Sequence, residues 1–269
     1  MINLGCGSRF HSDWINIDCV AQDPSVLVHD LSKGIPFGDN TCDVVYQSHV
    51  LEHLPRNAAK GMLQECRRVL RPGGILRVAV PDLEQVCRMY LQKLEAALAG
   101  DVAAAHDHEW MVVELIDQCI RQKSGGAMRE YLQRDSVPNL DFVVARIGEE
   151  ARGLINKTSS PTSPSLVLKV KQAVRDAVDN TRRVALRLLG GPQSDNALEI
   201  GRFRISGEPH LWMYDRLSLK VLLLDAGFST VEASQAGVSE VENWANYHLE
   251  VLPDGRIIKP DSLYMEAKK

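Results

Sequence analysis

The sequence predicts an α/β fold in which a mostly parallel sheet is covered by helices on both faces. The sequence contains several short apolar runs, and the later runs are each followed by a helical pattern. Strands that alternate with helices along the chain form parallel sheets. The apolar runs have the length of buried strands and are bounded by Gly, Pro, Asp and Asn; they lie at residues 2–4, 14–17, 26–28, 44–46 and 75–80.

Three segments place apolar residues at helical spacing and end at a glycine. Pro55 suits the first turn of one of these segments, and Asp82 is the expected N-cap of another. We expect the three helices at residues 55–71, 83–99 and 216–226, and further strands at 229–235 and 262–267.

The strand pattern stops from about residue 101 to about residue 204. Helical stretches dominate there, and a Ser/Thr/Pro-rich run at 157–165 is unsuited to a packed core. We therefore expect residues 1–100 and 205–269 to form one core domain, and residues 101–204 to be a helical insertion.

Composition disfavours several classes of function. A net charge of −4 over 269 residues gives no global attraction to nucleic acid. No apolar run approaches the roughly 18 residues of a membrane span, and no basic, then apolar, leader opens the chain, so we expect a cytoplasmic protein. The six cysteines form no CxxC pair, which is typical of reduced thiols.

The first two expected strands end in residues that suit a nucleotide cofactor. Gly5-Cys6-Gly7 follows the first strand, where a glycine turn lets a cofactor approach the backbone, and Asp18 ends the second, where an acid can bind a ribose diol. A plain strand-exit turn would also explain the glycines. A nicotinamide-dependent oxidoreductase is disfavoured, because Phe10 stands where GxGxxG needs its third glycine.

Residues 29–82 carry an ordered set of motifs: Asp30-Leu31, Ile35-Pro36-Phe37, Cys42–Val45, Ser48–His53, and Glu65 with Arg67–Pro81. In this order they resemble the central block of class I S-adenosylmethionine-dependent methyltransferases, of the methyltransferase type 11 group. The resemblance implies a Rossmann-like, seven-stranded, mostly parallel sheet, with S-adenosylmethionine as cofactor and S-adenosylhomocysteine as product.

The resemblance also implies which residues bind the cofactor. Two departures from the family pattern stand out: Asn3 replaces the usual acid and Arg9 the third glycine. Only nine residues, 5–13, join the first two strands, so the helix between them must be short or absent. The implied cofactor-binding residues are Asn3, Gly5, Cys6, Gly7, Asp18, Asp30, Leu31 and Ser48.

A sulfonium methyl group is already electrophilic, so the enzyme mainly aligns an acceptor and removes a proton if the acceptor is a hydroxyl. The candidate bases near the carboxyl edge of the sheet are His49, His210 and Asp82, and for each histidine a structural role is the alternative. We expect methylation of a small-molecule or glycan acceptor, with a non-catalytic scaffold in a glycan-biosynthesis complex as the alternative function.

Two further segments, 13–18 and 210–228, resemble a subgroup of bacterial methyltransferases associated with surface-glycan or lipopolysaccharide synthesis. This closer resemblance implies a glycan acceptor. We expect His210 to lie in a lid with Trp212 and Tyr214, since this stretch offers a base and aromatic walls.

The insertion offers weaker signals. Glu114, Asp117 and Arg121 share a helix face that could bind a polyol, although an ordinary Asp117–Arg121 pair is equally compatible. We expect no metal, because the spacing of His106, His108 and Glu109 matches no established ligand set. The basic amphipathic segment 166–189 is either a packed helix or a peripheral contact with the inner membrane face, and a second copy of the chain is a candidate partner.

Overall fold

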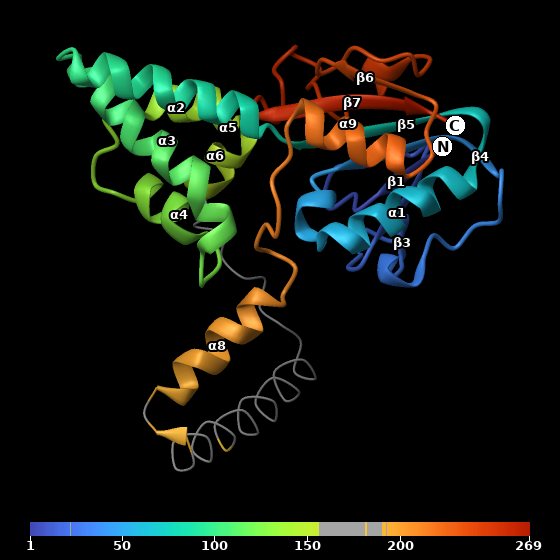
Figure 1. The fold of residues 1–269 in the computed structure, drawn as a ribbon, viewed down its shortest axis with the longest axis horizontal. Helices are drawn as coiled ribbons and strands as arrows, with labels where there is room; N and C mark the ends of the chain where they lie inside the picture. The colour runs from blue at the N-terminus through green and yellow to red at the C-terminus, as the bar shows by residue number, and fades with distance from the viewer. Residues whose placement is uncertain (22, 156–180, 182–189, 192) are drawn as a thin grey trace.

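The computed structural model describes residues 1–21, 23–155, 181, 190–191 and 193–269. Its centre is a seven-stranded sheet with strand order β3-β2-β1-β4-β5-β7-β6 (Figure 1). The first five strands are parallel, and β7 is antiparallel to both of its neighbours. The strands are β1 (Ile2–Leu4), β2 (Ile15–Asp18), β3 (Val26–Val28), β4 (Cys42–Ser48), β5 (Leu70–Pro81), β6 (Thr230–Ser234) and β7 (Ser262–Lys268).

This sheet confirms the predicted Rossmann-like fold. The strand bounds differ most at β5, which begins at Leu70 and not after the Pro-Gly-Gly run. Leu70 already pairs with Cys42, and an irregularity in the ladder between Cys42 and Val44 accommodates the extra residues.

Two helices cover one face of the sheet. Helix α1 (Arg56–Val69) and helix α9 (Arg216–Asp225) lie side by side there (Figure 1). The apolar side chains of Leu63, Leu219 and Leu223 are completely buried against the strands. A capping box between Asp215 and Ser218 fixes the start of α9.

The opposite face has no α-helix between β1 and β2, as the short link predicted, because residues 5–14 form a loop. A right-handed crossover would have placed its helix on this face. Instead, Trp14 and Tyr46 pack there against Trp244 from the short helix η3 (Trp244–Tyr247). The segment between β6 and β7 therefore covers this face of the sheet.

A helical bundle follows β5 at one end of the sheet (Figure 1). It has its own buried cluster around Trp110, Met111 and Tyr131, to which Val86 of α2 contributes. The bundle helices are α2 (Leu83–Leu98), α3 (Val102–Ile120), α4 (Gly126–Leu132), α5 (Leu140–Ile147) and α6 (Glu149–Ile155).

The last described helix before the core is α8 (Ser194–Arg204), whose Arg204 donates a hydrogen bond to the carbonyl oxygen of Cys119. Apart from Thr181, the expected basic segment 166–189 and the Ser/Pro-rich run 157–165 lie outside the described residues. Among the residues described, no helix is both long and apolar enough to cross a membrane.

Candidate active site

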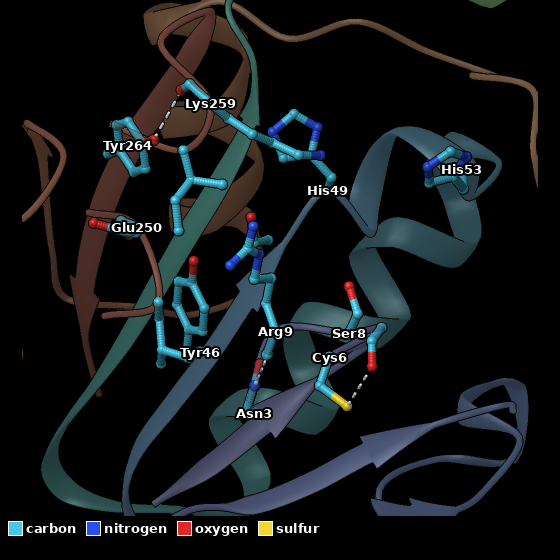
Figure 2. Close-up of a pocket in the computed structure, with 15 residues that line it drawn as sticks. Asn3, Cys6, Ser8, Arg9, Tyr46, His49, His53, Glu250, Lys259 and Tyr264 are labelled. Carbon is cyan, nitrogen blue, oxygen red and sulfur yellow. Dashed lines mark hydrogen bonds between the residues drawn. The ribbon is translucent and has the colours of Figure 1, made fainter. Parts of the chain in front are cut away.

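A cavity of about 300 Å³ opens at the carboxyl ends of β1 and β4. The loop after β1, residues 5–9, forms one wall, and His49, directly after β4, lies on the next (Figure 2). Ser48, the last residue of β4, also lines the cavity. Lys259 and Tyr264, near the start of β7, lie opposite. Because the carboxyl edge is where open parallel sheets bind ligands, we call this the first cavity and treat it as the cofactor site.

The glycine turn has a backbone shape that other residues resist. Gly5 and Gly7 have φ angles of 62° and 52°. A Cβ atom on Gly5 would lie 2.5 Å from Cγ2 of Val50, so the first glycine is needed for packing as well as for conformation. A Cβ atom on Gly7 would meet no atom within 4 Å, so the turn leaves open space at this residue.

Asn3 holds the turn from inside the sheet. Its side chain is 1% exposed, and Nδ2 donates to the carbonyl oxygen of Arg9 at 3.0 Å and to Oδ1 of Asn16 at 3.1 Å. The residue that replaces the expected acid therefore shapes the loop that lines the cavity. Asn16 belongs to the segment 13–18 that carries the subgroup resemblance, but the sequence assigned it no role of its own.

The acids after β2 and β3 lie along the same edge but outside the first cavity. Asp18 accepts hydrogen bonds from the backbone N–H of Gly7 at 2.8 Å and of Val20 at 3.0 Å. Asp30 caps the short helix η1 (Leu31–Lys33) and accepts from the N–H and the hydroxyl of Ser32. The structure thus joins Asp18 to the glycine turn, while Asp30 and Leu31 lie two strands away from β1.

His49 occupies a strained position directly after β4. Its φ of 54° is uncommon for a residue with a side chain and often marks a functional site. Its Nδ1 lies 3.0 Å from Oε1 of Glu52, and its Nε2 lies 2.8 Å from Oγ of Ser262. Burial lowers the pKa of His49, which favours the neutral ring. Ser262 was missed, because no local signal links it to a histidine so far along the chain.

A second cavity of about 410 Å³ lies on the other side of His49. It shares His49, His53 and Lys259 with the first cavity. The remaining walls come from the bundle and from the chain that leads back to the core: Gln118, Arg121, Ser124, Gly125, Arg129, Glu150, Gly153, Leu154, Glu208 and His210.

The other two candidate bases are placed differently. His210 borders the second cavity, is 5% exposed and lies edge-on to the ring of His53 at 4.8 Å between centroids. Burial lowers its pKa to about 3. Asp82 lines neither cavity: as predicted it caps α2, accepting from the N–H of Gln85, and burial raises its pKa.

The residues expected beside His210 do not share a wall with it. Tyr214 is buried in the main core, and Trp212 lies under the guanidinium of Arg56, 4.4 Å from the ring centroid. Backbone hydrogen bonds from Leu211 and Trp212 to the carbonyl oxygen of Glu52 hold this stretch against the core. Residues 210–214 therefore form a segment bound to the core, which we call the strap. Of His210, Trp212 and Tyr214, only His210 borders the second cavity.

The polar face of α3 is mostly internal. Glu114 accepts from Trp110 and from Arg146, and Asp117 pairs with Arg121 at 2.6 Å. Only Arg121 of the three predicted polyol-binding residues lines the second cavity. The alternative interpretation was a solvated face with an Asp117–Arg121 pair: the pair is present, but the face is buried.

The N-terminal part of the chain matches a known protein family. Residues 2–78 match the family described as a methyltransferase domain. The match covers β1 to β4, α1 and most of β5, including the glycine turn, Asp18, Ser48 and His49. No curated protein matches the chain.

Several solved structures resemble the chain at low sequence identity. A chain in the complex of the Haloferax volcanii Trm112 methyltransferase activator with a methyltransferase is 20% identical over 32% of this chain and 46% of that chain, with a TM-score of 0.26. This chain thus spans less than half the length of that structure. S-adenosylmethionine-dependent methyltransferases from Thermotoga maritima and Archaeoglobus fulgidus are 11% and 14% identical over all of this chain and 81% and 85% of theirs, with TM-scores of 0.35 and 0.37.

The residues present fit the cofactor that this family uses. Gly7 leaves open space beside the turn, the cavity lies at the carboxyl ends of the strands, and Asp18 is held next to the turn by the N–H of Gly7. The match therefore places a methyltransferase domain at residues 2–78, and the carboxyl edge of the sheet in this domain has features that suit S-adenosylmethionine.

Proposed function

We propose that the enzyme methylates a hydroxyl oxygen of a small molecule or glycan bound in the second cavity. The observation that carries the proposal is that the two cavities meet at His49, His53 and Lys259. An acceptor in the second cavity and a cofactor in the first would therefore face each other across His49.

The charges of the second cavity suit a polar acceptor. Arg121, Arg129 and Lys259 line it together with Glu150 and Glu208. The Nε atoms of Arg121 and Arg129 are buried without a hydrogen-bond partner. Buried donors of this kind are normally satisfied, so they favour an acceptor rich in oxygen atoms, as a polyol or sugar is. The resemblance of residues 13–18 and 210–228 to glycan-associated methyltransferases supports the same class.

The cofactor, when bound, supplies an electrophilic methyl group, and the chain has to position the acceptor and take up a proton. We assign the proton to Nε2 of His49. Glu52 lies at Nδ1, so a neutral ring that donates from Nδ1 has its accepting lone pair on Nε2, where it meets the hydroxyl of Ser262. Ser262, whose Oγ lies at Nε2, marks where a hydroxyl group can approach.

The experiment is an acceptor screen with isotopically labelled cofactor, followed by the rate of methyl transfer in His49→Asn. Asparagine tolerates the positive φ at this position but is not a base. We expect the turnover number to fall by about 10²–10⁴-fold, with cofactor affinity nearly unchanged. His248→Asn is the matched control, because His248 also has a positive φ, of 50°, but lies exposed outside both cavities.

Full activity in His49→Asn would remove His49 as the base. A product methylated on nitrogen or carbon would show that the acceptor class is wrong. Detection of an O-methylated sugar or polyol, with the methyl position fixed by NMR, would support the proposal.

A further inference from the structure

Three side chains with metal-ligating atoms converge where the strap meets the end of η2 (Leu51–His53). One ligand atom each from Glu52, His53 and His210 lies within 4.8 Å of the others. Glu52 is fully buried and His210 is 5% exposed. Among the described residues this is the one group of at least three histidine, cysteine or acidic side chains close enough to hold a metal ion.

Two atoms of this group are buried without a partner, Oε2 of Glu52 and Nδ1 of His210. The other carboxylate oxygen of Glu52, Oε1, lies 3.0 Å from Nδ1 of His49. Buried polar atoms are rarely left without a partner, and a ligand that binds both an oxygen and an imidazole nitrogen would satisfy the two atoms together.

We propose that Glu52, His53 and His210 bind a first-row divalent metal ion of the zinc type. Two imidazoles and one carboxylate are a ligand set that such ions favour, and it leaves coordination positions open. Nδ1 of His53 lies 3.3 Å from the carbonyl oxygen of Pro209, and a ring that donates there keeps Nε2 for the metal.

The backbone holds these ligands in place. The N–H groups of Leu211 and Trp212 donate to the carbonyl oxygen of Glu52 at 2.7 and 3.2 Å, and the N–H of His210 donates to Gln118 at 3.0 Å. Glu52 and His210 are therefore tied together by the chain itself. Such support is what a metal site needs to keep its geometry.

This group differs from the one considered in the sequence. Glu109 forms an ion pair with Arg134, and His108 stacks on Tyr90. The expectation of no metal rested on local spacing, which cannot show that His210 folds back onto Glu52. Because His53 and His210 line the second cavity, the bound ion would meet the oxygen of an acceptor there. That role rests on the proposed function, whereas binding of the ion does not.

The test is direct titration of chelator-treated full-length protein with Co²⁺, followed by visible absorption, and with Zn²⁺ by calorimetry. We expect one ion per chain and a rise in melting temperature with Zn²⁺. His210→Ala and Glu52→Gln should each weaken binding by about 100-fold or more, beyond the roughly 10–100-fold that loss of a second-shell partner costs. His106→Ala, at a histidine of α3 outside the group, is the matched control and should bind as the wild type does.

Circular dichroism and S-adenosylhomocysteine affinity are measured on the same variants. His210→Asn, at a residue outside the first cavity, replaces Glu52→Gln if the latter does not fold. Lost ion binding with retained cofactor binding supports the site. Equal Co²⁺ affinity in the wild type and in the folded variants, or no stoichiometric binding by the wild type, overturns it. In that case methyl transfer to a hydroxyl could still be found, so the two proposals fail separately.

Discussion

The two cavities are built in different ways from the same chain. One wall of the first cavity rests on backbone conformation and on a continuous stretch of sequence, with Gly5, Gly7 and Asn3 forming one turn, while its other walls come from the end of β4 and from residues 249–264. The second cavity is made of side chains from α3, α4, α6 and the strap, which are brought together only by the fold. The wall that we propose for the cofactor therefore depends on backbone shape, whereas the proposed acceptor cavity can vary with each side chain.

The largest expected effect concerns the buried ion pairs that join β5 to Glu250, a residue that lines the first cavity, and to β7. Arg77 of β5 is fully buried and pairs with Glu250 at 2.6 Å and with Glu266 at 2.8 Å. Arg77→Met leaves both acids unpaired inside the protein, so the free energy of unfolding should fall by about 3–5 kcal/mol. Urea denaturation measures this change.

Arg71→Met on the same strand is the control for Arg77. Its side chain is 52% exposed and its guanidinium pairs with the exposed Asp43, so the change should be at most about 1 kcal/mol. Equal destabilisation by the two variants would contradict a special role of the buried ion pairs in holding the first cavity together.

The second prediction tests whether the glycine turn is needed for its shape. In Gly5→Ala the new methyl group would collide with Val50 and the backbone would be strained, so cofactor affinity should fall by about 10–100-fold. The double variant Gly5→Ala/Val50→Ala removes the collision and should recover part of the loss. Calorimetry with S-adenosylhomocysteine gives both values, and Gly61→Ala in α1 controls for glycine replacement.

How much of this could be predicted depended on whether the residues were neighbours in sequence. The strands, the N-cap Asp82 and the glycine turn follow from local patterns, as does the loop in place of the first helix. The partners Ser262 of His49 and Glu250 of Arg77 could not be predicted, because each pair is joined by the return of the last strands to the sheet.

Contacts between residues far apart in sequence also explain why the predicted lid did not form a single wall. His210, Trp212 and Tyr214 are close in sequence, and their composition favours an aromatic wall. The backbone bonds to Glu52 and the bridge between Tyr214 and Asp82 turn the three side chains toward different surroundings. Composition alone carries no information about such a strap.

The third prediction concerns the acid next to the turn. Asp18→Asn keeps one oxygen acceptor but loses the charge that strengthens the hydrogen bond from Gly7. We expect cofactor affinity to fall by roughly 10-fold, about 1.4 kcal/mol, with the acceptor KM unchanged. Asp13→Asn, an exposed acid on the same loop, is the control. Wild-type cofactor affinity in Asp18→Asn would remove Asp18 from the cofactor site.

The fourth prediction concerns the second cavity, where a substitution should change the acceptor KM and leave cofactor affinity unchanged. Arg129→Met removes a buried, unpartnered donor, so the acceptor KM should rise by about 5–10-fold while cofactor affinity stays the same. Steady-state kinetics with the identified acceptor provide the measurement. Lys123→Met, at an exposed pair with Glu130, should change neither value. A loss of cofactor affinity in Arg129→Met would mean that the two cavities are not separate in function.

The smallest effect concerns stability where the bundle meets β7. Burial and the nearby acids Glu114 and Glu150 raise the pKa of Asp261 from 3.8 to about 7. Between those pH values the folded state holds a proton that the unfolded chain has lost, so the free energy of unfolding should fall as pH rises from 4 to 7 and stay low above it.

Asp261→Asn mimics the protonated form and should match the wild type at pH 4. At pH 8 it should be more stable by about 1 kcal/mol, because partial exposure of Asp261 screens the charge. Thermal denaturation at both pH values tests this, with the exposed Asp254→Asn as control. A variant that is equally displaced from the wild type at both values would show that Asp261 affects packing and not proton binding.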